Sequence, residues 1–105
     1  MRIASVFILL CLMTAPVKAA EADPSAGARL AKTECETCHA VGPDAAAKSP
    51  DARAPRFVDV AKMPSTTELS LKVFLRTPHR NMPNLILSPE EIDSVAAYIL
   101  SLAGK

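Results

Sequence analysis

The sequence of 105 residues has few aromatic side chains and few cysteines, and both shortages limit what the chain can be. It contains no tryptophan, one tyrosine and three phenylalanines, and its formal net charge is only +1. Because no basic stretch is interleaved with aromatic residues, nothing in the chain suggests nucleic-acid binding. Of the three cysteines, Cys11 lies in an apolar run near the N-terminus, where we interpret it as a passive apolar residue. Cys35 and Cys38 are the other two.

The N-terminal segment has the layout of a secretory signal peptide. Arg2 gives a positive start, residues 3–13 are nearly all apolar, and residues 17–19 form a small-x-Ala cleavage site. We therefore expect residues 1–19 to be a signal peptide and residues 20–105 to be one domain. The apolar run is shorter than the roughly 20 residues that a membrane span needs, so an uncleaved anchor is the less favoured alternative. The domain is predicted to be exported to the periplasm, with no stable membrane insertion after cleavage.

The stretch from Glu34 to His39 carries the most specific pattern in the chain. Cys35 and Cys38 are separated by two residues, and His39 follows directly, which is the attachment signature of c-type haem. One helical turn separates the two sulfurs, so both can form thioethers with the vinyl groups of one porphyrin, and His39 can then ligate the iron. A redox dithiol would need a strand-helix-strand context, and a zinc site would need a second ligand pair, for which only His79 remains. The sequence therefore predicts one covalent haem c.

The predicted haem also contributes to the stability of a domain that has a small apolar core. Once the signal segment is removed, Cys35 and Cys38 are the only cysteines, so the domain has no disulfides to reinforce a small core. We expect the haem to be the largest apolar object in that core. The chain without haem is predicted to be largely unfolded.

Capping residues and apolar periodicity predict helices separated by coils. Gly27 lies in the first of these helices, where it indicates either a close helix-helix contact or a tolerated surface glycine. A backbone carbonyl of the loop at residues 40–55 is expected to accept a hydrogen bond from the His39 ring, and we assign it to Pro50. The first predicted helix runs from the Asp23 cap and Pro24 to the haem motif, and it is followed by a loop over residues 40–55 and an apolar turn over residues 57–61. The next predicted helix begins with a capping box at residues 65–68 and ends at Pro78. The last begins with a capping box at residues 88–91 and runs to Gly104.

The iron requires a sixth ligand, and three side chains downstream of His39 are candidates. Met82 is favoured because it lies in a coil between two helices, and Pro83 stiffens the backbone just after it. Met63 lies in a similar Met-Pro pair, but little chain separates it from His39. His79 follows a helix end and can also be a solvated side chain. An open or water-bound site is the remaining alternative.

The chain resembles the small single-haem class I c-type cytochromes over nearly its whole length after the signal segment. The resemblance rests on Cys35-Glu36-Thr37-Cys38-His39, on residues 54–57, on Met82-Pro83, and on residues 87–92 leading to residues 97–102. It implies an all-α fold of three to four helices packed around one covalently attached haem, with the first and last helices crossing.

The same resemblance implies roles for particular residues. Gly27 and Tyr98 would lie at or near the helix crossing, and His39 and Met82 would be the axial ligands. The chain departs from larger relatives because it has no tryptophan to contact a haem propionate. Arg53, Arg56 or Lys62 are the candidates to replace it.

An iron bound by histidine and methionine has no free position for a substrate, so the chain is predicted to be an electron carrier and not an enzyme. Its partners would be redox proteins that donate and accept the electron. Seven basic residues lie between Lys48 and Arg80, against three acidic ones, and this segment can steer an acidic partner surface or can simply be solvated. The alternatives are a dedicated cytochrome subunit of a periplasmic dehydrogenase and, less favoured, a haem ligand sensor or peroxidase.

Overall fold

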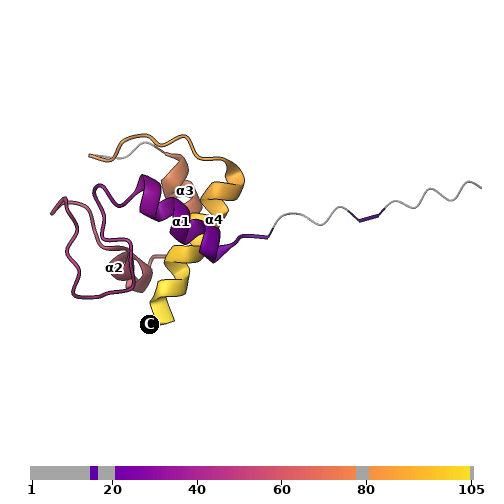
Figure 1. Ribbon diagram of the computed structural model, residues 1–105. Helices are drawn as coiled ribbons and strands as arrows, with labels where there is room; N and C mark the ends of the chain where they lie inside the picture. The colour runs from indigo at the N-terminus through magenta and orange to yellow at the C-terminus, as the bar shows by residue number, and fades with distance from the viewer. Residues whose placement is uncertain (1–14, 17–20, 78–80, 105) are drawn as a thin grey trace, which may run out of the picture.

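The computed structural model describes residues 15–16, 21–77 and 81–104. Nearly all of the predicted signal peptide lies outside these residues, as do Pro78 and His79. The described residues form helices and coil without a strand, which confirms the predicted all-α class (Figure 1). The elements are α1 (Pro24–Glu34), α2 (Phe57–Lys62), α3 (Glu68–Arg76), α4 (Pro89–Ser101) and the 3₁₀ turn η1 (Leu102–Gly104). In the described part of the chain, no helix is long and apolar enough to cross a membrane.

Helices α1 and α4 form the centre of the fold and overlap in the middle of Figure 1. They contact closely at Gly27, where a Cβ atom would overlap the carbonyl oxygen of Ser94 and lie 2.9 Å from Cβ of Tyr98. The backbone N–H of Asp23 also donates to Ser94 Oγ at 3.3 Å. The implied crossing of the first and last helices at Gly27 and Tyr98 is therefore confirmed.

The core around this crossing is entirely apolar. No polar or charged side chain is buried among the described residues. Helix α2 packs against η1, so the C-terminal turn covers the core next to α2. The buried residues of the cluster are Ala31, Cys35, Phe57, Val58, Ala61, Leu71, Val95, Ala96, Ile99 and Leu102.

Side-chain caps set the helix starts. At α1, the Asp23 carboxylate accepts from the N–H of Ser25 at 2.9 Å, as predicted. At α4, the predicted capping box is present: Glu91 N–H donates to the Ser88 hydroxyl at 3.2 Å, and Ser88 N–H donates to the Glu91 carboxylate at 2.8 Å.

The capping box predicted at residues 65–68 is wrong in its register. The box is formed by Thr67 and Ser70, whose hydroxyls accept from each other's backbone N–H groups at 3.0 and 2.8 Å. A serine hydroxyl can take the place of the glutamate in this motif because it also reaches back to the cap residue. Ser70 additionally donates to the Ser65 carbonyl at 3.1 Å, which fixes the chain entering the helix.

Candidate haem site

The two cysteines follow directly from the C-terminus of α1. Cys35 caps the helix, and its N–H donates to the Ala31 carbonyl at 2.9 Å. The N–H groups of Cys38 and His39 both donate to the Cys35 carbonyl, at 3.1 and 2.9 Å, so one further turn places all three side chains in succession. The two cysteines do not form a disulfide with each other. Before haem attachment, burial, aided by the Glu34 charge, raises the pKa of the Cys35 thiol to about 11.

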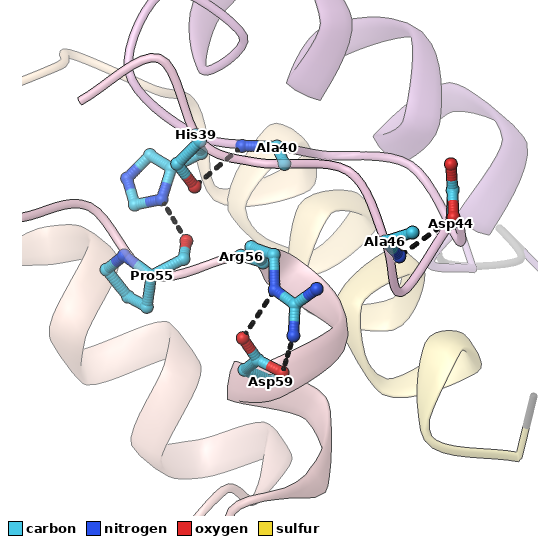
Figure 2. A network of polar contacts seen from close by, with 8 residues as sticks. His39, Ala40, Asp44, Ala46, Pro55, Arg56 and Asp59 are labelled. Carbon is cyan, nitrogen blue, oxygen red and sulfur yellow. Dashed lines mark hydrogen bonds and ion pairs between the residues drawn. The ribbon is translucent and has the colours of Figure 1, made fainter. Parts of the chain in front are cut away.

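The His39 ring is fixed by a backbone carbonyl, but not by the predicted one. His39 Nδ1 lies 2.6 Å from the carbonyl oxygen of Pro55 (Figure 2). A carbonyl can only accept, so Nδ1 carries the proton and Nε2 keeps its lone pair for a metal. The ring also lies against Phe57, with ring centroids 5.2 Å apart.

The assignment to Pro50 is wrong because of how the loop folds back. Asp51 N–H donates to the Cys38 carbonyl at 3.1 Å, and Phe57 N–H donates to the Ala40 carbonyl at 2.9 Å. These two hydrogen bonds hold the second half of the loop next to the haem motif. They place the Pro55 carbonyl beside the His39 imidazole. Pro50 itself is exposed.

A cavity of about 310 Å³ lies against the motif and brings the predicted site residues together. Cys35, Cys38 and His39 line it, and so does Met82 from the coil between α3 and α4. Met63 is not part of this lining and is 44% exposed, and His79 lies outside the described residues. The apolar side chains that complete the wall are Phe57, Val60, Leu71, Phe74, Leu75, Leu85 and Ile99.

One ion pair lies on the cavity wall and another lies away from it. Arg53 and Asp51 both line the cavity, and the guanidinium donates twice to the carboxylate, at 3.1 and 3.0 Å. These hydrogen bonds hold the pKa of Asp51 below its usual value. Arg56 instead binds Asp59 at 2.7 and 2.8 Å, outside the lining, and Figure 2 shows it directed away from the His39 ring.

The donor set suits haem and not a bare metal ion. No group of three or more histidine, cysteine or acidic side chains in the described residues could hold a metal ion. The cavity instead offers two thiols, one oriented imidazole and one thioether among mainly apolar walls. Apolar walls with a few placed polar groups are typical of cofactor sites. The sequence did not single out Asp51 or Asn81, which also line the cavity, because no motif marks them.

A helical domain with this thiol pair and imidazole at one apolar cavity is the class of small c-type cytochromes. The family model described as cytochrome c oxidase, cbb3-type, subunit III, matches residues 22–99, and the chain belongs to this family of c-type cytochrome domains. It is 39% identical over 95 residues to cytochrome c-552 of Bradyrhizobium diazoefficiens, across 90% of this chain and 89% of the relative. No solved structure matches.

These matches confirm the predicted fold class and cofactor. The protein is an electron-transfer haem protein with a covalently bound c-type haem, and its homologues are electron carriers. Proteins of this class interact with redox partners and are typically exported.

Proposed function

We propose that this chain is a periplasmic carrier of single electrons, whose haem is tethered by Cys35 and Cys38 and bound axially by His39 and Met82. In this proposal residues 1–19 are a cleaved signal peptide and residues 20–105 are the cytochrome domain. The observation that supports it most strongly is that Met82, far along the chain from the haem motif, lines the same cavity as His39.

Each of these residues has a separate task. The haem supplies a one-electron iron centre when bound. The two thiols hold it covalently, so a small domain need not enclose it by packing alone. The Nδ1–H donation to Pro55 holds the His39 ring in one tautomer and orientation. The Met82 thioether would be the second ligand of the haem iron, where it would raise the reduction potential and leave no position for a substrate, as expected for a carrier and not for an enzyme.

Arg53 is the side chain that we assign to a haem propionate. Of the three candidates from the sequence, Arg53 alone lines the cavity, and neither Arg56 nor Lys62 is part of its lining. Arginine suits this role because its guanidinium presents several donors to a carboxylate.

The positive charge of the middle segment is not spread evenly over its basic residues. Among the described basic residues of the middle segment, three are neutralised by ion pairs: Arg53 with Asp51, Arg56 with Asp59, and Lys72 with Glu68 and Asp93. We propose that Lys48, Lys62 and Arg76 carry the remaining steering charge towards an acidic partner surface. Electron-transfer rates with such a partner should fall as salt rises.

A cytochrome subunit held within a larger complex is the second candidate. The description of the matching family model, which names an oxidase subunit, favours it. The match along most of both chains to a relative named simply as a cytochrome supports the carrier instead. A complex subunit, whether of an oxidase or of a dehydrogenase, should co-migrate with an oxidoreductase in gel filtration of a periplasmic extract, whereas a carrier should elute alone.

The axial ligation is tested by spectra of the purified holoprotein in both oxidation states. Sulfur ligation of the ferric iron and poor carbon monoxide binding by the ferrous protein are expected. Met82→Ala should open the site to carbon monoxide, and Met63→Ala, a change at an exposed methionine outside the cavity, should not. Rapid stoichiometric carbon monoxide binding by the unaltered protein would favour a sensor or peroxidase, and an unchanged Met82→Ala spectrum would exclude Met82 as the ligand.

A further inference from the structure

The residue before Met82 has an uncommon backbone conformation. Asn81 has a φ of 65°, and among the described residues no other non-glycine residue has a positive φ. In this left-handed region the Cβ atom of an L-residue comes too close to the following carbonyl oxygen. Glycine adopts it freely, and asparagine tolerates it better than most other residues. The conformation therefore requires one of a few residue types at this position.

Met82 is restricted from both sides. Pro83 disfavours the helical region for the residue before it, which leaves Met82 in the extended region. Asn81 turns the chain immediately before Met82. All three residues line the cavity, although they belong to a coil and not to a helix. The two restrictions together leave Met82 with few backbone conformations at the cavity wall.

We infer that Asn81 is a positioning residue for the Met82 thioether, and that it acts through its left-handed backbone. The inference rests on the proposed function, in which Met82 is an axial ligand. A ligand carried by a coil loses conformational entropy when the metal bond forms, and this loss weakens the bond. A backbone already held in the binding conformation has less entropy to lose. When residue 81 leaves the left-handed region, Met82 should leave the cavity wall with it.

The inference separates the backbone of Asn81 from its amide group. Asn81→Gly removes the amide but keeps access to the left-handed region. Asn81→Val has a β-branched side chain, for which a positive φ is a rare outlier. Asn84→Val is the matched control, because Asn84 lies in the same coil, is exposed, is not part of the cavity lining and has no positive φ.

The experiment measures the binding of imidazole, which competes with Met82, to the ferric holoprotein of each variant. Placing an ordinary residue in the left-handed region costs about 1–2 kcal/mol, which corresponds to roughly a 5–30-fold change in an equilibrium constant. Asn81→Val should therefore bind imidazole about tenfold more tightly than the unaltered protein. It should also lose part of the long-wavelength absorption that reports iron–sulfur bonding. The imidazole affinities of Asn81→Gly and Asn84→Val should stay within about threefold of that of the unaltered protein, since in both variants residue 81 can still adopt the left-handed conformation.

Two results would overturn the inference while leaving Met82 as the ligand. One is an unchanged imidazole affinity in Asn81→Val, when Met82→Ala does open the site. The other is a defect in Asn81→Gly as large as that in Asn81→Val, which would assign the effect to the amide. If Met82→Ala leaves the spectrum unaltered, the proposed ligation fails and this inference fails with it. Should Asn81→Val not take up haem, Asn81→Ala makes the same comparison with a smaller side chain.

Discussion

Replacing Gly27 by alanine should destabilise the holoprotein because it forces α1 and α4 apart. The new Cβ would overlap the Ser94 carbonyl oxygen and lie 2.5 Å from its carbonyl carbon. Optimal separations between non-bonded carbon atoms are about 3.5–4.0 Å, so the helices must separate by roughly 1 Å or more. The obstacle is helix backbone, which cannot rotate away as a flexible side chain could.

The magnitude follows from two opposing terms. Overpacking a well-filled contact costs typically about 1–3 kcal/mol, and a backbone clash belongs at the upper end. Alanine regains about 1 kcal/mol of helix propensity over glycine. We therefore expect a net loss of about 2 kcal/mol, which corresponds to a fall in Tm of roughly 8–16 °C for a domain of this size.

The assay is denaturant and thermal unfolding of the holoprotein, followed by circular dichroism and by haem absorption. Gly42→Ala is the matched control, because a Cβ at Gly42 meets nothing within 4 Å and its φ is not positive. That substitution should be neutral or stabilise by about 0.4–1 kcal/mol. If the free energy of unfolding of Gly27→Ala lies within about 0.5 kcal/mol of that of the unaltered protein, the close helix crossing contributes little to stability.

Three further predictions concern the core, the cavity wall and the haem itself. Tyr98→Phe removes an O–H donation to the Val41 carbonyl at 2.5 Å and should cost about 1 kcal/mol in denaturant unfolding. Burial raises the pKa of Tyr98, so the unfolded state loses the phenol proton at a lower pH than the folded state does. The free energy of unfolding should therefore fall as pH rises above about 10, and it should fall less in Tyr98→Phe. Arg53→Gln should lower the reduction potential measured by redox titration, because it removes a positive charge from the cavity wall, and an equal shift in Arg56→Gln would contradict the propionate assignment. A variant lacking both tether cysteines should be largely unfolded, and a cooperative helical thermal transition would show that the haem is dispensable for folding.

Local patterns in the sequence were sufficient to predict the haem motif and most helix boundaries. The Cys35–His39 spacing and the Ser88–Glu91 cap depend on residues within one helical turn, so the sequence displays them directly. The wrong register at Thr67 has the same local origin, since a glutamate was expected where the Ser70 hydroxyl accepts the hydrogen bond from the cap residue. Such errors concern which of several competent side chains is used.

The errors and gaps at the site have a different cause. The choice of Pro55 over Pro50 depends on hydrogen bonds between segments far apart in the loop, from Asp51 to Cys38 and from Phe57 to Ala40. No periodicity marks such contacts. Likewise, the sequence does not distinguish Arg53 from Arg56 and Lys62 as the partner of a haem propionate. Only the structure distinguishes them, because Arg53 alone lines the cavity.

Helix α3 shows why the haem and the fold depend on each other. Of its nine residues only Leu71 is buried, and Val73 and Phe74 are about half exposed. Leu71, Phe74 and Leu75 all line the cavity, so the apolar side of α3 faces the haem site as well as α4. Helices α1 and α4, by contrast, bury their apolar residues against each other. Apolar burial is the main stabilising term in folding, and a nine-residue helix is too short to be stable alone. The stability of α3, and of the coil that carries Met82 from its end, therefore depends on the haem more than the stability of the α1–α4 pair does.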